Sequence, residues 1–239
     1  IDHVLVDTGS TGLRLLKSAV TPALLAALPG DSLYSCVQFL DGSYMWGPVV
    51  KADVSMGGDQ LRHLTASRFP IQLVINSTDS PAPHEDCAGT AADPAERSND
   101  DVSKLGANGI LGIGTDPQDC GNYCAIVQNN GRYYTDTPTV TGTTVALTEQ
   151  VQQPVSRFAS DNNGTLIELP LVPATGASVA NGWLIFGIGT QSNNALGSAT
   201  VFRFTDPSQY AQFFTAYGAK TGLQGFIDSG SNGLFFGSR

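Results

Sequence analysis

Residues 4–13 read VLVDTGSTGL, and residues 225–234 read GFIDSGSNGL. In both stretches apolar residues lead into an Asp, which is followed by a small hydroxylated residue, Gly, Ser, any residue, Gly and Leu. An apolar strand that ends in this way places a carboxylate where the chain must turn, and the Gly allows a tight turn beside it. Two copies whose Asp residues are 221 positions apart (228 minus 7) predict two pseudo-symmetric lobes that share one cleft.

The paired stretches resemble those of the pepsin-like aspartic peptidases. They are most similar to an uncharacterised bacterial branch of that superfamily, which carries the same Asp-Thr-Gly-Ser-x-Gly-Leu-Arg and Asp-Ser-Gly-Ser-Asn-Gly-Leu-Phe-Phe motifs. The resemblance runs from Val4 to Phe236 and implies an all-β, bilobal, pepsin-like acid-protease fold. It assigns residues 1–144 to the first lobe, and residues 145–239 to the inter-lobe crossover and an incomplete second lobe.

Pepsin-like chains have strands before the first Asp and much of the second lobe after the second. By this comparison we expect the chain to be truncated at both ends. We also expect a fragment of this extent to be inactive, because only eleven residues follow Asp228 and no second bracing strand can cross behind its loop.

The motif match predicts that Asp7 and Asp228 are a catalytic pair of an aspartic-type endopeptidase. Two carboxyl groups within hydrogen-bond reach cannot both ionise easily, so they share a proton. One then takes a proton from a bound water molecule, which attacks the scissile carbonyl group of an extended polypeptide. The other hydrogen-bonds the carbonyl oxygen and later helps to protonate the leaving amine. The alternative is a catalytically silent pepsin-like binding protein. The resemblance implies that six neighbouring residues support the pair: Thr8, Gly9, Ser10, Ser229, Gly230 and Ser231.

A predicted hairpin lies between the strands expected at residues 35–40 and 44–50, where Asp41-Gly42 is a tight-turn signal. The resemblance identifies this hairpin as the flap that closes over substrate, although the usual flap Tyr has no clear match. The candidate substrate-binding residues are Phe39, Leu40, Asp41, Gly42 and Tyr44.

Other segments follow the same comparison. Gly109-Ile110-Leu111-Gly112 resembles the strand that crosses behind the first Asp loop, and Arg14 occupies a position where an aromatic residue is common. A short helix is expected from Pro22, and a second over residues 145–158 that Pro154 ends or breaks. Strands are expected at residues 71–75, 165–169, 182–189 and 194–204, and a long polar loop at residues 76–104.

The chain contains four Cys and no Cys-x-x-Cys pattern, which favours disulfides over zinc. The short Cys120–Cys124 loop suits one bridge, which leaves Cys36 to pair with Cys87. The other two connectivities and four buried free thiols remain open from sequence.

Composition narrows the function classes. The 239 residues include 27 Gly and 13 Pro and are 41% hydrophobic, which indicates an ordered, turn-rich chain. A net charge of −9 without a Lys/Arg cluster argues against nucleic acid and anionic membranes. No apolar run approaches the roughly 18 residues of a membrane span. We expect a monomeric, extracytoplasmic protein that is secreted, periplasmic or surface-anchored, and whose signal segment is absent from this chain.

Sequence patterns for a metal site, a nucleotide site or a serine nucleophile are weaker than the paired Asp motifs. His84-Glu85-Asp86-Cys87 contains metal-ligand residue types, but no second ligand cluster stands at zinc spacing, and a solvated loop is favoured. Residues 109–114 contain a Gly pattern without the helix that a nucleotide site requires. Ser10 lacks the flanking pattern of a serine nucleophile. No metal and no cofactor are therefore predicted.

Overall fold

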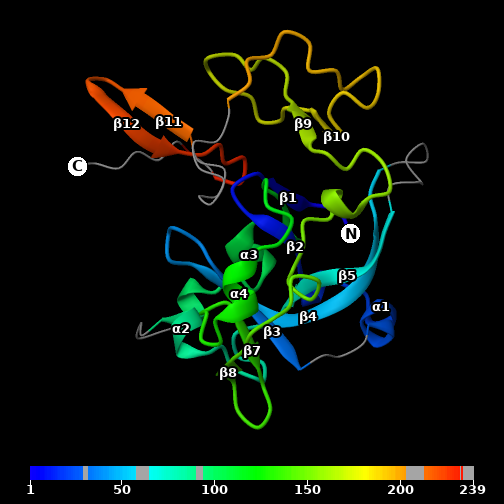
Figure 1. Cartoon of the computed structure of the whole chain (residues 1–239), viewed down its shortest axis with the longest axis vertical. Coiled ribbons are helices and arrows are strands. Elements are labelled where there is room, and N and C mark those ends of the chain that lie inside the picture. The colour runs from blue at the N-terminus through cyan, green and yellow to red at the C-terminus, as the bar shows by residue number, and fades with distance from the viewer. Residues whose placement is uncertain (29–31, 58–64, 90–93, 203–212, 232, 234–239) are drawn as a thin grey trace.

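The computed structural model describes residues 1–28, 32–57, 65–89, 94–202, 213–231 and 233. The protein consists mostly of β-sheet, with short helices between the strands (Figure 1). This confirms the all-β prediction. The predicted positions Asn232 and Leu234 to Phe236 lie outside the described residues.

The largest sheet has eight strands in the order β1-β6-β2-β5-β4-β3-β7-β8. Its centre is built from apolar strands that pair across long sequence separations, and the tight turn at Gly42 (φ 84°) joins β3 to β4. The strands are β1 (Val4–Asp7), β2 (Thr11–Leu16), β3 (Leu33–Gln38), β4 (Tyr44–Ser55), β5 (Thr65–Val74), β6 (Gly109–Ile113), β7 (Tyr133–Thr135) and β8 (Thr141–Gly142).

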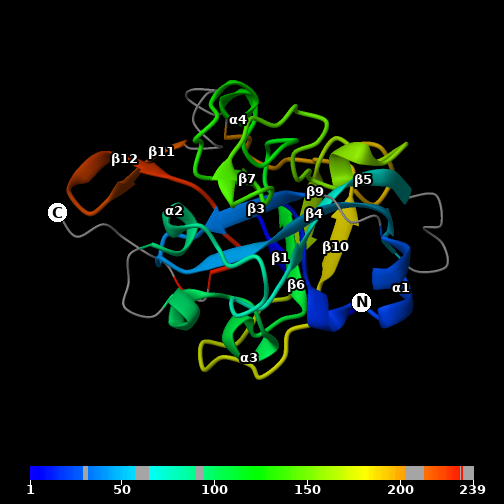
Figure 2. The ribbon, with the colours of Figure 1, turned by 90° about the horizontal axis from the view of Figure 1, so that it is seen from below.

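Two antiparallel pairs follow in the chain: β9 (Thr165–Glu168) with β10 (Trp183–Phe186), and β11 (Phe213–Tyr217) with β12 (Lys220–Gly225). Figures 1 and 2 both show the β11–β12 hairpin projecting from one side of the molecule, away from the large sheet.

The helices are short. Pro22 opens α1 (Pro22–Ala27), as predicted, and the Thr21 hydroxyl accepts a hydrogen bond from the Leu24 N–H at its start. The others are η1 (Lys17–Ala19), α2 (Glu85–Ala88), η3 (Pro94–Arg97), α3 (Val102–Leu105), α4 (Asn122–Ile126) and η4 (Val155–Arg157). Among the described residues, no helix has the length and apolar character needed to cross a membrane.

Residues 145–158 do not form the predicted helix, since only η4 at their end is helical. The segment instead makes a turn at residues 147–149 and packs against the large sheet. The side-chain amides of Gln150 and Gln152 donate hydrogen bonds to neighbouring backbone carbonyls, which replaces helical hydrogen bonding. Of the five apolar residues that suggested a helical face, Leu147 is exposed and the other four are buried in the cores on the sheet: Val145, Val151, Val155 and Phe158.

This packing joins residues 145–158 physically to the large sheet. The boundary between a first lobe of residues 1–144 and the rest of the chain remains a prediction.

The strand expected at residues 182–189 is shorter and less buried than predicted. It spans only β10, in which Phe186 is buried while the Trp183 side chain is 73% exposed. An apolar run predicts a strand but does not say which face is covered. Residues 194–202 contain no strand, contrary to the prediction, and residues 203 and 204 lie outside the described part.

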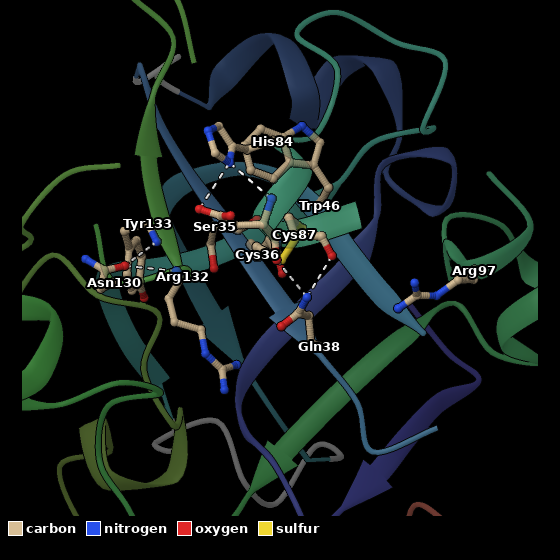
Figure 3. Close-up of a disulfide and its surroundings, with 12 residues drawn as sticks. Ser35, Cys36, Gln38, Trp46, His84, Cys87, Arg97, Asn130, Arg132 and Tyr133 are labelled. Atoms are coloured by element: carbon tan, nitrogen blue, oxygen red, sulfur yellow. Dashed lines mark hydrogen bonds and ion pairs between the residues drawn. A yellow bond between two sulfur atoms is a disulfide. The ribbon is translucent and has the colours of Figure 1, made fainter. Parts of the chain in front are cut away.

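Both preferred disulfides are present. Cys36–Cys87 and Cys120–Cys124 have Cα–Cα distances of 5.8 and 5.7 Å. Figure 3 shows Cys36–Cys87 beside the Trp46 ring. The Cys87 carbonyl oxygen accepts a hydrogen bond of 2.9 Å from the Gln38 amide, so the bridge and this contact tie α2 to β3. Two disulfides are typical of proteins that fold in an oxidising, extracytoplasmic environment.

Candidate active site

The Asp7 loop is held by the strand that crosses beneath it. Strand β6 pairs in parallel with β1 and antiparallel with β2, so it lies between the two arms of the loop. A Cβ atom at Gly112 would lie 2.8 Å from the backbone nitrogen of Gly12, so this close crossing requires Gly. The Gly114 N–H then donates a hydrogen bond of 2.8 Å to the Ser10 carbonyl oxygen. The loop is therefore braced on its own sheet.

Two hydroxyl groups connect the Asp7 loop to the loop after β12. The Thr8 hydroxyl donates to the Ile227 carbonyl oxygen (2.7 Å) and accepts from the Ser229 N–H (3.0 Å). The Ser229 hydroxyl donates to the Val6 carbonyl oxygen (2.8 Å) and accepts from the Thr8 N–H (3.1 Å). The contact is reciprocal, as the matching motifs require. Figure 1 shows the blue strand β1 and the red segment after β12 side by side.

This connection brings Asp7 and Asp228 together. The Asp228 carboxyl group lies against Gly9 of the first loop and the Asp7 carboxyl group against Gly230 of the second, and each carboxyl group acts on the pKa of the other. The N–H groups of Gly9 and Gly230 each donate a hydrogen bond of 2.8 Å to the Asp of their own loop. Each Gly also faces the opposite carboxyl group: an added Cβ would lie 2.8 Å from the Asp228 Cγ at Gly9, and 2.7 Å from the Asp7 Cγ at Gly230.

The two carboxyl groups differ electrostatically. Burial raises the pKa of Asp7, and contact with Asp228 raises it further, although the Ser10 hydroxyl and the Gly9 N–H act in the opposite direction. Burial also acts to raise the pKa of Asp228, but hydrogen bonds from Ser231 and Asp7 outweigh it and leave this pKa below its usual value. Such a pair holds one proton between two acids.

The predicted flap turn is well ordered by side-chain contacts. The Asp41 carboxylate accepts hydrogen bonds from the N–H and hydroxyl of Ser43, and Arg97 donates to the Gly42 carbonyl oxygen. Leu40 at the tip is 93% exposed, whereas Tyr44 is fully buried in the core around Cys36–Cys87. Tyr44 therefore presents no surface to a ligand in this structure. The flap role remains a prediction for Phe39 and the turn residues.

His84 has a local structural role. Its Nδ1 accepts a hydrogen bond from the Asp86 N–H at the start of α2, and its ring stacks on Tyr134 with centroids 5.0 Å apart. Figure 3 shows the His84 ring near Trp46 and the disulfide. In the described ranges, no three His, Cys, Asp or Glu side chains converge as metal ligands.

Sequence reasoning did not find a buried polar network behind the Asp7 loop. Arg14, on β2, forms an ion pair of 2.7 Å with Asp119, and both side chains are almost completely buried. Arg14 also donates to the Gln72 amide oxygen. The Tyr133 hydroxyl donates to Asp119 and accepts a hydrogen bond of 2.6 Å from the Val151 N–H. Burial and the negative charge of Asp119 raise the pKa of Tyr133 well above its usual range.

One signal of this network was visible in the sequence. Arg14 is the only charged residue in the apolar run of residues 11–16, and a charge in such a strand requires a buried partner. Nothing in the spacing identified Asp119, which is 105 residues away in the chain.

The chain belongs to a family described as "Protein of unknown function (DUF3443)", whose model matches residues 1–239. No curated protein matches the sequence.

Proposed function

We propose that this protein is an aspartic-type endopeptidase that uses Asp7 and Asp228 to activate water against a peptide bond. The observation that carries the proposal is that the Asp7 and Asp228 loops, 221 residues apart in sequence, meet so that each carboxyl group lies against the Gly of the opposite motif. The reciprocal hydrogen bonds of Thr8 and Ser229 support it, because they hold the two loops in a fixed relation.

The geometry suits general acid–base chemistry. An ionised carboxylate can accept a proton from water, and a protonated neighbour can donate to the carbonyl oxygen that develops negative charge. The Gly9 and Gly230 N–H groups orient the carboxyl groups through hydrogen bonds of 2.8 Å. A proton shared between the acids requires an acidic or weakly acidic working pH.

The proposed architecture is pepsin-like and bilobal, with residues 1–144 as the first lobe. The substrate is an extended polypeptide that lies between the lobes, under the turn at Phe39 to Gly42. The proposed working state is a monomer in an extracytoplasmic compartment, where the two disulfides remain oxidised.

A binding protein without catalysis is the second candidate. The observation that favours it is the burial of Tyr44, which removes the only tyrosine of the predicted flap from the surface. Under this alternative the Asp pair is a polar contact that fixes the two loops, and a peptide binds without being cleaved.

A cleavage assay separates these candidates. The full-length natural protein is incubated with a denatured protein substrate from pH 3 to pH 7, with and without pepstatin, and new N-termini are counted. The proposal predicts pepstatin-sensitive cleavage that Asp7→Asn reduces by about 10²–10⁴-fold. Asp79→Asn is the matched control, because Asp79 is half-exposed and its ion pair with Lys17 is 3.8 Å long. Peptide binding without cleavage at any pH in this range would instead support the binding protein.

A further inference from the structure

A small polar pocket of about 220 Å³ lies between the start of α2 and the β7–β8 region. His84 and Asp86 line it from the start of α2, Tyr134 from β7, Gly142 from β8, and Asn129 from the segment before β7. None of the described residues of the two Asp loops lines it. Sites for drug-sized ligands measure about 300–1,000 Å³, so this pocket suits a smaller ligand.

The walls of the pocket are held by a disulfide, strand pairing and aromatic contacts. The Cys36–Cys87 bridge ties α2 to β3, and β7 pairs with β3. The Tyr134 ring stacks on the His84 ring with centroids 5.0 Å apart, and it meets the Trp46 ring edge-on at 5.3 Å. These contacts fix the polar groups of the pocket before any ligand arrives, which lowers the entropy cost of binding.

The Tyr134 hydroxyl has no hydrogen-bond partner among the described residues. Tyr134 is 1% exposed, whereas the other described residues that line the pocket are partly or fully exposed, so Tyr134 closes its inner end. Burial raises the pKa of Tyr134 to about 12, and the negative charge of Asp86 adds to this rise against the opposing charge of Arg132. The hydroxyl therefore keeps its proton. Buried polar groups in folded proteins are nearly all paired, so this hydroxyl indicates a partner from outside the chain.

The other polar groups of the pocket supply both donors and acceptors. The His84 Nδ1 accepts a hydrogen bond of 3.2 Å from the Asp86 N–H, so the imidazole proton is on Nε2 and can be donated (Figure 3). The Asp86 carboxylate lies 3.5 Å from the same Nδ1, and its side chain is 59% exposed, so its oxygens can still accept. Asn129 adds an amide group that can both donate and accept.

This set of groups favours a neutral ligand that carries several hydroxyl groups. Among the lining residues that the structure describes, Asp86 is the only one with a formal charge, so an anion would be repelled. An ammonium group has donors only, and it would leave the Tyr134 hydroxyl and the His84 Nε2–H without acceptors. A hydroxyl group donates and accepts, so neighbouring hydroxyl groups of a sugar ring match acceptors and donors together.

We propose that this pocket binds one unit of a neutral sugar. Asp86 accepts a hydrogen bond from one sugar hydroxyl group, while the Tyr134 hydroxyl and the His84 Nε2–H donate to sugar oxygens. The inference goes beyond the proposed function and does not depend on it, because the pocket lies apart from the Asp pair and its test involves no peptide.

Binding is measured by NMR titration of the ¹⁵N-labelled full-length natural protein with the methyl glycosides of glucose, galactose, mannose and N-acetylglucosamine. With at least one sugar we expect saturable shifts of the Gly131, Tyr134 and Gly142 amide signals and a Kd of about 1 mM. The Gly9 and Gly230 signals should not move. Butylamine, as the cationic comparison, should bind more weakly.

Three results of this titration would overturn the proposal. They are the absence of a saturable shift with every sugar at about 100 mM, tighter binding of butylamine than of any sugar, and sugar-induced shifts confined to the Asp loops. An ordered water molecule that alone satisfies the Tyr134 hydroxyl would give the first of these results.

Two adjacent tyrosines of β7 provide reciprocal controls. Tyr134→Phe removes an unpaired hydroxyl, so it should leave the urea midpoint unchanged or raised while it weakens sugar binding about tenfold. Tyr133→Phe removes a hydroxyl that bonds to Asp119 and to the Val151 N–H, so it should lower the midpoint and leave sugar binding unchanged. A Tyr134→Phe variant that binds sugar as tightly as the parent, or that is destabilised, would overturn the role of this hydroxyl.

The Asp86 carboxylate is tested against its neighbour on α2. Asp86→Asn should weaken sugar binding about tenfold, because hydrogen bonds to a charged acceptor are roughly twice as strong as neutral ones. Glu85→Gln is the matched control: it removes the same charge from the adjacent exposed residue, which is not among the residues that line the pocket. Equal sugar affinities of the two variants would show that Asp86 makes no direct contact with the sugar.

Discussion

A methyl group at Gly9 should disable the Asp pair without unfolding the protein. The Gly9→Ala substitution places a Cβ atom 2.8 Å from the Cγ of Asp228, and 3.0 and 3.1 Å from its two carboxylate oxygens. Gly9 is exposed, and its backbone is not in the left-handed region. The added methyl group therefore acts through the opposite carboxyl group, and neither backbone strain nor loss of core packing accompanies it.

The size of the effect follows from these distances. Ordinary contact between Cβ and another heavy atom begins at 3.4 Å and extends to about 4 Å. The Asp228 carboxyl group must therefore move by 0.6 Å (3.4 minus 2.8) or more. A misplacement of about 1 Å in a catalytic group can lower a rate by about 10²-fold. We expect kcat/KM to fall by this order, with a change in unfolding free energy below about 1 kcal/mol.

The measurement compares Gly9→Ala with Gly233→Ala in peptide cleavage and in urea unfolding. Gly233 belongs to the second motif and does not have a positive φ, and a Cβ atom added there would have no heavy atom of the described residues within 4 Å. Gly233→Ala should retain the parent activity. Equal activity of the two variants would refute the close approach of Gly9 to Asp228. Loss of activity in both would show that the effect is not specific to this contact.

Three further predictions concern stability. Asp119→Ala leaves the buried Arg14 guanidinium unpaired and should lower the unfolding free energy by about 3–5 kcal/mol in urea titrations; a loss below 1 kcal/mol would contradict the buried ion pair. Replacing the Cys36–Cys87 pair by Ser should cost about 4 kcal/mol and the Cys120–Cys124 pair about 2 kcal/mol, because the loops span 51 and 4 residues; equal losses would contradict the loop-length argument. Burial acts to raise the pKa of Asp100, but a hydrogen bond from Lys104 helps to leave this pKa below 3.8. The contribution of ionised Asp100 to folding stability is therefore lost as pH falls below that value. Asp100→Asn should therefore lose less stability on acidification than the parent protein, and a steeper loss would contradict this sign.

The parts of the fold that sequence predicted are those with strong local signals. The apolar residues before Asp7 form β1, and Ile110-Leu111-Gly112 lies in the strand beneath its loop. The tight turn at Gly42 and the helix after Pro22 also follow local backbone preferences. The contact between Asp7 and Asp228 was predictable only because the motif occurs twice, since no local property connects residues so far apart.

The parts that sequence missed depend on tertiary partners. Residues 145–158 have helical spacing, but Gln150 and Gln152 bond to backbone carbonyls, and the apolar side chains pack on the large sheet instead. The exposure of Trp183 depends on which face of β10 is covered, and an apolar run does not specify that face. Asp119 could not be paired with Arg14 before the chain was folded.

The central claim is that Asp7 and Asp228 act as one catalytic unit. The most direct test is the pH dependence of kcat/KM for peptide cleavage by the full-length natural protein and by Asp7→Asn, Asp228→Asn and the double variant. Groups that act as a unit are not additive. We predict cleavage with an acidic optimum in the parent, and losses in the two single variants that are as large as the loss in the double variant. Cleavage that survives either substitution, or losses that multiply in the double variant, would contradict the claim.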